Sequence, residues 1–272
     1  MVLWQSYLKN ISVKMYLTTR LRKNKFLILR KWVSVIHNFA YIIGLFRQLL
    51  TGVPITLMFI LISWIIGFAL SGIITLGRLS PKKYFSFPLN TLVSFVRSVP
   101  IVLQLFLVYY GFPVLVEKFI GVNINNINKM VFCVITFSIY YGFYLSEILR
   151  PAYLSVKQEQ RDAAFGLGYT KSQANIHVII PQMFSVAIPS LGNEVINLIH
   201  QSSILFVLGT VDLMGQADMI ITTDYTASPL LTYFCAGMIY WVITIIVSII
   251  IRLLEFRIDR YQVDDVKGGR TI

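Results

Sequence analysis

Charged side chains are scarce in this sequence, and their scarcity excludes a soluble globular protein. Asp, Glu, Lys and Arg together make up 13% of the 272 residues, whereas 56% are apolar. The mean hydropathy of +0.71 lies well outside the usual balance of soluble proteins. Several apolar runs reach the roughly 20 residues that a helix needs to cross a bilayer. We therefore expect an integral membrane protein.

Cysteine and histidine are also rare, with two and three residues respectively. Cys133 and Cys235 both fall inside apolar runs, with neither metal-ligand spacing nor the pattern of a disulfide framework. They are expected to be small buried apolar residues. The sequence predicts no metal site and no cofactor bound by this chain.

Basic residues exceed acidic ones, and the formal net charge is +12. Lys and Arg cluster beside the apolar runs, as membrane topology requires. No soluble-looking domain shows a basic patch with interleaved aromatic residues. Nucleic-acid binding is therefore excluded as a function class.

The apolar runs predict an all-α integral membrane protein with about five transmembrane helices. The second run contains one charge, Arg97, and the fourth contains Glu194 and His200. The predicted spans cover approximately residues 54–77, 88–111, 130–147, 183–209 and 230–254.

Basic residues set the predicted orientation, because cytoplasmic loops hold the excess of Lys and Arg. The loops after the first and third spans and the tail after the fifth are rich in Lys and Arg. The loop after the fourth span has no basic residue but contains Asp212, Asp218 and Asp224. We expect a multi-pass membrane protein whose C-terminus is cytoplasmic.

The first 50 residues form a basic N-terminal extension that this orientation would place outside the cell. Either Trp32–Leu50 is an amphipathic interfacial segment, which we favour, or it is a sixth crossing. A cleavable signal peptide is not expected, and Met15 is an alternative start. The predicted division is thus an extension at 1–50, a transmembrane domain at 51–257 with a cytoplasmic loop at 155–181, and a cytoplasmic tail at 258–272.

The polar stretch QRDAAFGLGYTKSQANIHVIIP, Gln160–Pro181, stands out between apolar runs. Helix formers lead to Gly168 as a C-terminal cap, and a second helical run, Lys171–Ile180, is expected to stop at Pro181. From the residues alone, this segment is either a compact protrusion that another protein binds or a solvated loop that lies on the membrane.

The spacing Asp162-Ala163-Ala164, Gly168, Val178 and Ile180-Pro181 resembles the cytoplasmic EAA signature of ABC importer permeases. Asp replaces the family's Glu, Val its Ile and Ile its Leu. In that family, the segment is the coupling helix that docks on a cytoplasmic ATPase. The resemblance implies this coupling role for Gln160, Asp162, Ala163, Ala164, Gly166, Gly168 and Pro181.

Further blocks resemble the polar amino-acid branch of these permeases over about two hundred residues. They are Arg97–Pro100 with Gln104–Phe106, Tyr144–Arg150 and Pro189–Asn193. The resemblance implies a type I ABC importer permease fold and partners: a second permease subunit, a solute-binding protein and an ATPase that binds ATP and Mg. The stretch Val207–Ile221 resembles members associated with cystine.

Polar residues within the second and fourth spans are candidates for the translocation path. Arg97 either meets a substrate carboxylate or pairs with Glu194 or Glu147. The alternative for Gln104 is interhelical hydrogen bonding, and the alternative for His200 is a hydrogen-bonded packing residue. The candidates are Arg97, Gln104, Glu194, His200, Gln201 and Ser202.

Other classes of function have less support in the sequence. Gly166–Ser172 superficially resembles a phosphate-binding loop but lacks the glycine before Lys171, so ATP hydrolysis is expected in a partner and not in this chain. An ion-coupled secondary transporter is the alternative function, but it predicts internal repeats, and none is obvious. A membrane enzyme has only His200, Ser202 and Ser203 to support it.

Overall fold

A computed structural model describes residues 40–225 and 227–268, with side chains described up to residue 257. The described residues fall into two units, residues 40–48, which are helical, and residues from 49 onward. Residues 1–39 of the predicted N-terminal extension lie outside the described residues, whereas residues 40–50 of the predicted interfacial segment are described and helical. The side chains of the predicted tail at 258–272 also lie outside them, although helix α11 (Pro229–Gly268) runs into that tail.

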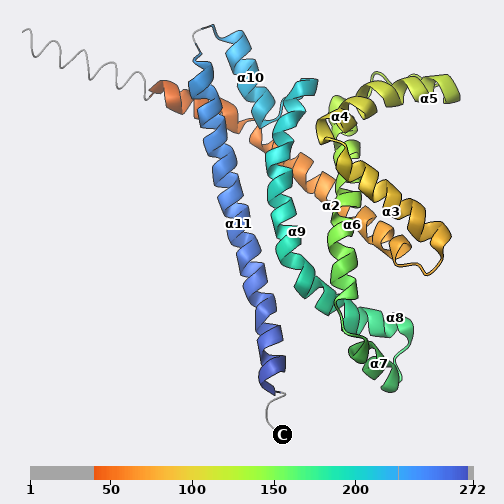
Figure 1. Ribbon diagram of the computed structural model, residues 1–272. Coiled ribbons are helices and arrows are strands. Elements are labelled where there is room, and N and C mark those ends of the chain that lie inside the picture. Colours follow the sequence, from red (N-terminus) through yellow and green to blue (C-terminus); the bar gives the residue numbers. More distant parts are fainter. Residues whose placement is uncertain (1–39, 226, 269–272) are drawn as a thin grey trace, which may run out of the picture. The chain divides into compact units, whose positions relative to one another are not determined.

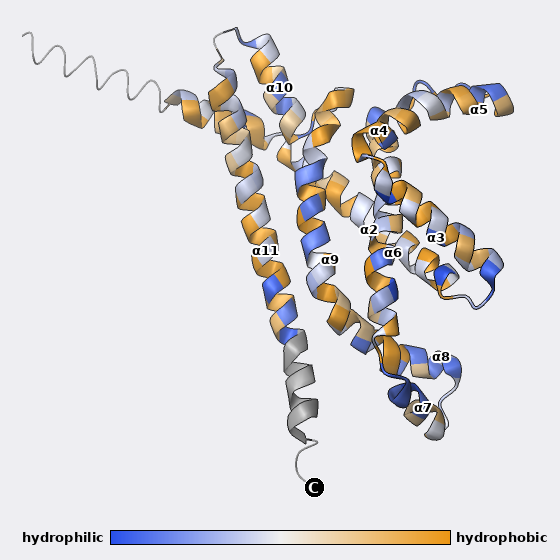
Figure 2. Cartoon of the chain, in the orientation of Figure 1, coloured by the Kyte–Doolittle hydropathy of each residue, from blue (hydrophilic) through white to orange (hydrophobic). Residues whose placement is uncertain are grey.

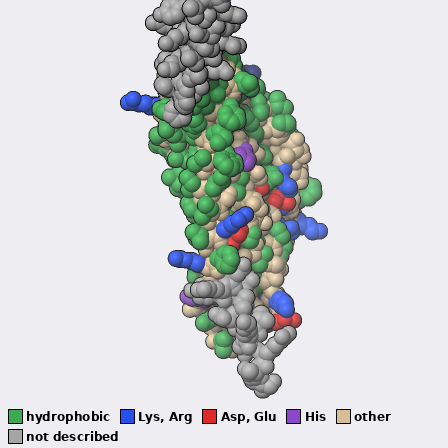
Figure 3. All heavy atoms as spheres, turned by 90° about the vertical axis from the view of Figure 1, so that its left-hand side faces the viewer, with side chains coloured by type: hydrophobic (Ala, Val, Ile, Leu, Met, Phe, Trp, Pro, Cys, Tyr) green, Lys and Arg blue, Asp and Glu red, His purple; other side chains and the backbone are tan. Residues whose placement is uncertain are grey.

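Within the described residues, all regular structure is helical, and five helices are long and apolar enough to cross a membrane. Hydropathy colouring shows apolar residues along most of these helices (Figure 2). Large apolar side chains such as Leu61, Ile73 and Leu253 are exposed, and apolar atoms dominate the face in Figure 3. These findings confirm the predicted all-α class and the number of spans. The spans are Ala40–Arg78, Ile101–Ile120, Lys129–Ser155, Lys171–Leu208 and Pro229–Arg257.

The second predicted span, 88–111, is wrong as a continuous helix. Helix α3 (Lys83–Ser98) ends at an extended Val99, with φ −94° and ψ 125°, and α4 (Ile101–Phe106) begins after Pro100. A proline disfavours the helical conformation of the residue before it, which explains the break at Val99. The apolar path continues through the π-helical turn η1 (Leu107–Gly111) into α5 (Phe112–Ile120).

The prediction that the second helix of the polar segment ends at Pro181 is also wrong. Helix α8 (Lys171–Ala174), the π-helical turn η2 (Asn175–Ile179) and α9 (Ile180–Ser202) follow one another without a break. In η2, the Ile180 N–H donates to the carbonyl of Asn175, five residues earlier. The wider turn displaces the carbonyl that a proline ring would otherwise strike, so the helix passes through Pro181. In η1, Phe112 donates to Leu107 in the same way, one residue before Pro113.

Helices α2 (Val53–Arg78) and α6 (Lys129–Leu154) pack along a stripe of small residues, which we call the α2–α6 seam (Figure 1). A Cβ added at Gly67 would lie 3.0 Å from the Cβ of Tyr141, and one at Gly142 would lie 2.9 Å from the Cβ of Leu70. Small residues at four-residue spacing allow such close approach within a membrane. The buried seam residues are Ser63, Gly67, Ser71 and Thr75 on α2 and Ser138, Gly142 and Ser146 on α6.

Helix α9 packs against both α6 and α11, and it continues as a short 3-10 turn, η3 (Ser203–Leu208). Helix α10 (Leu213–Thr223) begins at Asp212, whose carboxylate accepts hydrogen bonds from the N–H groups of Met214 and Gly215. The Leu213 N–H donates to the Thr56 hydroxyl at 2.9 Å, which ties α10 to the start of α2. Burial raises the pKa of Asp212 above its usual range, and the hydrogen bonds from Gly215 and Met214 to its carboxylate oppose the rise.

Candidate functional site

The predicted coupling segment forms a helix–turn–helix, α7 (Gln158–Gly166) followed by α8. Gly168 has φ +84°, a left-handed conformation that glycine adopts without steric cost. The Tyr169 N–H donates to the Ala164 carbonyl at 3.1 Å, and the Gly168 N–H donates to that of Phe165 at 2.9 Å. These are the two hydrogen bonds of a Schellman motif, and they confirm Gly168 as the predicted cap.

Side chains of the coupling segment divide between contact with the protein and exposure. Ala164 is buried, whereas the other six predicted coupling residues are exposed: Gln160, Asp162, Ala163, Gly166, Gly168 and Pro181. Arg161 lies over the ring of Tyr153 on α6 and donates to its carbonyl at 2.7 Å. The Tyr153 hydroxyl donates to Asn175 at 3.1 Å. These contacts fix the segment to the end of α6 and leave its outer surface open.

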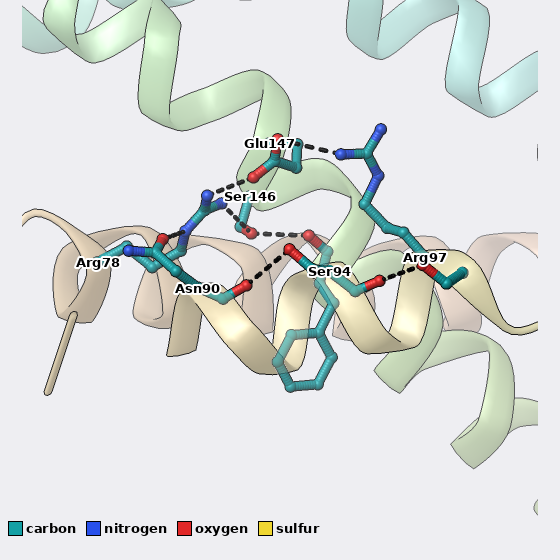
Figure 4. Close-up of polar contacts among 8 residues, drawn as sticks. Arg78, Asn90, Ser94, Arg97, Ser146 and Glu147 are labelled. Carbon is teal, nitrogen blue, oxygen red and sulfur yellow. Dashed lines mark hydrogen bonds and ion pairs between the residues drawn. The ribbon is translucent and has the colours of Figure 1, made fainter. Parts of the chain in front are cut away.

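A second polar region surrounds Glu147 on α6, whose two carboxylate oxygens bind two arginines (Figure 4). Arg78 contacts one oxygen and also donates to Asn90 of α3 at 2.8 Å and to Ser146 at 3.0 Å. Arg97 contacts the other oxygen at 3.1 Å. Of the two ion pairs that the sequence left open for Arg97, the structure contains the one with Glu147.

The two arginines differ in exposure. The Arg78 side chain is 6% exposed, and the Arg97 side chain is 41% exposed. The Arg97 guanidinium carbon also lies 5.1 Å from the ring centroid of Tyr144, within the range of a cation–π contact. Arg78 is thus enclosed by α2, α3 and α6, whereas Arg97 is held by one ion pair and one ring on an open surface.

Helices α6 and α9 meet close to this cluster. The Tyr141 hydroxyl donates to the side-chain oxygen of Gln201 at 3.2 Å. Tyr140 stacks on Tyr144 with ring centroids 5.5 Å apart. Glu194 accepts a hydrogen bond at 3.2 Å from Asn197 on its own helix. Of the predicted path residues, Arg97 and Gln201 therefore contact α6, whereas the carboxylate of Glu194 accepts a hydrogen bond from its own helix.

The other predicted path residues have separate surroundings. The Gln104 amide donates to the carbonyls of Val96 and Val99, at 2.8 and 2.9 Å, and so fixes the break between α3 and α4. The exposed His200 lies 3.4 Å from the Thr244 hydroxyl of α11. The buried Ser202 donates to a carbonyl of its own helix, that of Ile199. Gln104 thus bonds to the backbone before Pro100, and His200 contacts α11.

Sequence reasoning missed Arg78, Asn90 and Ser146 as members of the charge cluster. Arg78 follows an uncharged span, at the start of a segment that the sequence predicts to be a cytoplasmic loop. It also missed Tyr140, although Tyr140, Tyr144 and Glu147 share one face of a helix at spacings of four and three residues, a recognisable signal. No group of three or more His, Cys, Asp or Glu side chains suited to a metal occurs in the described part of the chain.

Known proteins are similar to this chain over most of its length. A family described as "Binding-protein-dependent transport system inner membrane component" matches residues 67–260. The "Probable amino-acid permease protein YxeN" of Bacillus subtilis is 34% identical, over 80% of this chain and 94% of that protein. The "L-cystine transport system permease protein TcyB" of the same organism is 32% identical, over 77% of this chain and 86% of that protein.

A solved structure supports the same fold. It is described as the "Crystal structure of an amino acid ABC transporter with histidines" and superimposes with a TM-score of 0.70 at 30% identity. The similarity covers 80% of this chain and 98% of the other. The arrangement of helices described above is therefore that of an ABC importer permease.

Proposed function

Because this chain belongs to the family of binding-protein-dependent transport system inner membrane components, we propose that it is the membrane-spanning permease subunit of an ATP-binding-cassette importer for polar amino acids. The observation that carries the proposal is the exposed α7–α8 segment between two spans, capped at Gly168 and fixed to α6. Its small exposed residues, Ala163 and Gly166, leave room for another protein's surface.

The ATPase is a separate partner, and it binds ATP and Mg. Two copies of the ATPase bind the coupling segments of two permease subunits, which are either identical or related. When the two ATPases close on ATP, the coupling segments move, and the permease shifts between inward-facing and outward-facing states, a rigid-body population shift. This chain performs no covalent chemistry and binds no cofactor.

Charge distribution supports an orientation in the bacterial cell membrane with α7–α8 and the C-terminus in the cytoplasm. A solute-binding protein delivers the amino acid near the outer loop at 210–228. In that loop, Asp212 is buried as the cap of α10, whereas Asp224 is exposed. Asp212 therefore acts in the fold of the loop and not as a docking charge.

L-cystine is the substrate we propose to test first. One relative named above is an L-cystine transport system permease, and Val207–Ile221 resembles cystine-type members. The path lies along exposed and half-buried polar residues of α3, α6 and α9, with Arg97, Glu194 and Gln201 as its central members and Gln104, His200 and the buried Ser202 at its margins.

The test is uptake by liposomes that contain the permease with its ATPase and binding protein. We expect ATP-dependent uptake of labelled L-cystine, with other polar amino acids as competitors. Uptake driven by an ion gradient in the absence of the ATPase would support the secondary-transporter alternative and overturn the proposal.

Two variants test the coupling segment. Ala163→Asp and Gly168→Arg should leave the permease in the membrane but abolish capture of the ATPase and transport. Charge and bulk block the docking surface in both variants, and a side chain at Gly168 also strains the turn. Asn125→Asp, in the exposed loop before α6, adds one negative charge elsewhere and is the matched control. Wild-type capture and transport by both coupling variants would refute the assigned role.

A further inference from the structure

Helix α3 packs against the rest of the chain along one narrow face. Of its 16 residues, only Val93 is buried. Leu89 packs over Gly77 of α2, where an added Cβ would lie 2.5 Å from the Leu89 Cδ1 atom. Asn90 and Arg97 make the polar contacts with α2 and α6 that Figure 4 shows. An element with few buried apolar contacts has low local stability, so α3 can move more easily than a helix buried on several sides.

The chain between α3 and α4 has fewer main-chain hydrogen bonds than a continuous helix. In a continuous helix, the Val96 carbonyl accepts from the N–H four residues later, but that residue is Pro100, which has no N–H. The N–H groups of Leu103 and Gln104 both donate to the Pro100 carbonyl, so neither serves Val99. The carbonyls of Val96 and Val99 are therefore left without their usual main-chain donors at the break.

The side-chain amide of Gln104 supplies both missing donors. Its nitrogen lies 2.8 Å from the Val96 oxygen and 2.9 Å from the Val99 oxygen. A primary amide carries two hydrogens, and here both bind to the backbone. Gln104 thus replaces the N–H that Pro100 lacks and connects the last turn of α3 to the first turn of α4. One side chain therefore holds the break at its present angle.

We propose that the break at Val99–Pro100 is a joint that bends during transport, and that Gln104 is the positioning residue that holds its resting angle. This inference rests on the proposed function. When the two carbonyls leave the amide, α3 turns about the joint and carries Arg97 with it. The two neutral hydrogen bonds favour the held joint over the opened joint by at least roughly tenfold. Movement of the coupling segments on ATP binding overcomes this preference.

Two other roles of Gln104 predict different behaviour. A side chain that only stabilises the fold would lower the melting temperature but would not change how the joint responds to ATP. A side chain that binds substrate could not be replaced by a main-chain N–H at position 100. A positioning role predicts both a changed response to ATP and a replacement of the amide by that N–H.

The test measures the distance across the joint in the complete permease–ATPase complex by electron–electron resonance between two spin labels. The labels are attached through Phe87→Cys on α3 and Leu107→Cys directly after α4, because these side chains are 73% and 67% exposed. The buried Cys133 and Cys235 are replaced by alanine. Labelled permease is diluted into unlabelled permease, so that only distances within one chain are measured. We expect one distance without nucleotide and a different distance with ATP and vanadate.

Gln104→Leu removes both donors and should open the joint before ATP binds. Without nucleotide, this variant should show both distances, with their population ratio changed by at least roughly tenfold from wild type. Gln182→Leu makes the same change on α9, away from the joint, and should keep the wild-type ratio. If Gln104→Leu does not assemble on size exclusion, Gln104→Glu replaces it. Its ionised side chain has the same length but no donor, so the same shift is expected.

Pro100→Ala in the Gln104→Leu background tests the replacement of the amide. The substitution restores a main-chain N–H four residues after Val96 and frees Val99 to become helical. The double variant should therefore show a single distance that no longer responds to ATP, because α3 and α4 form one continuous helix. Two distances, as in Gln104→Leu alone, would show that the amide does not stand in for the missing N–H, and the inference would fail.

Two further results would overturn the inference. One is a wild-type distance that is the same with and without ATP and vanadate, and the other is a wild-type ratio in Gln104→Leu. Either result together with ATP-dependent uptake by wild-type permease in liposomes would leave the proposed function intact. Absence of that uptake would count against the function itself, so the two failures are distinguishable.

Discussion

Arg78 and Arg97 bind the same carboxylate, but only one of them is enclosed. Arg78 uses its Nε and both terminal nitrogens on three partners and is 6% exposed, whereas Arg97 uses one nitrogen and is 41% exposed. Removal of one partner from a buried ion pair is strongly destabilising, because the other charge stays buried without compensation. A half-exposed charge with spare donors can exchange its partner. The same glutamate thus joins a structural region to a region able to bind a ligand.

The difference extends beyond the two side chains. Arg78 ends the α2–α6 seam, where small buried residues bring the two helices close together. Arg97 begins the open polar surface of α3, α6 and α9. On this comparison, substitutions on the seam side should change stability, and those on the open side should change binding with little effect on stability.

Arg78→Gln should produce the largest loss of stability. It leaves Glu147 with one cation and removes the donors to Asn90 and Ser146 in a buried site, a loss of about 3 to 5 kcal/mol for a broken buried pair. The measurement is the apparent melting temperature of the complex in detergent by intrinsic fluorescence. Arg78→Lys keeps the charge but not the fork of donors, so it should recover only part of the loss. A melting temperature equal to wild type would contradict the structural role of Arg78.

Gly67→Ala tests the seam itself and should destabilise by about 1 to 3 kcal/mol, the range for overpacking. The new Cβ would meet the Tyr141 Cβ at 3.0 Å and the Ser138 carbonyl oxygen at 3.2 Å, and neither group can move without displacing α6. Gly72→Ala on the same helix is the matched control, because nothing lies within 4 Å of its added Cβ. Equal melting temperatures for the two variants would show that the seam is looser than described.

Much of the fold could be predicted from the sequence, because hydropathy averaged over about 20 residues identifies spans whatever their detailed geometry. Gly168 could be predicted too, since a glycine after a run of helix formers has a specific backbone role. The continuation through Pro181 could not be predicted, because it depends on a π-helical turn that local propensity does not encode. The break at Val99 follows from the proline rule, but the apolar run concealed it.

The candidate site was predicted less completely than the fold. Arg97 and Glu194 were found because a charge inside an apolar run is conspicuous. Arg78 was missed because a basic residue after a span is also what cytoplasmic loops contain. Its partners Ser146 and Glu147 are 68 and 69 residues away along the chain, and only the folded structure brings them together.

Gly168→Ala tests the coupling segment on the open side and should destabilise the α7–α8 turn by about 1 kcal/mol, the cost of a left-handed conformation for a residue with a Cβ. The φ of Gly168 is +84° and no atom lies within 4 Å of an added Cβ, so the effect is conformational and not steric. Hydrogen exchange of the amides at 158–166 should become faster. Gly166→Ala, which has equal space and no positive φ, should leave exchange unchanged or slow it. Equal exchange in the two variants would contradict the role of Gly168 as a cap.

Arg97→Gln should have the smallest effect on stability, at most about 1 kcal/mol, as for other exposed ion pairs. Glu147 keeps its contact with Arg78 in this variant, so no buried charge is left without a partner. The measurement is the melting temperature of the variant, compared with that of Arg78→Gln under the same conditions. The double variant Arg97→Gln/Glu147→Gln should lose more stability than Arg97→Gln, because it also removes the charge that Arg78 requires. A loss from Arg97→Gln as large as that from Arg78→Gln would mean that both arginines are structural, and the distinction between an enclosed and an open side of Glu147 would fail.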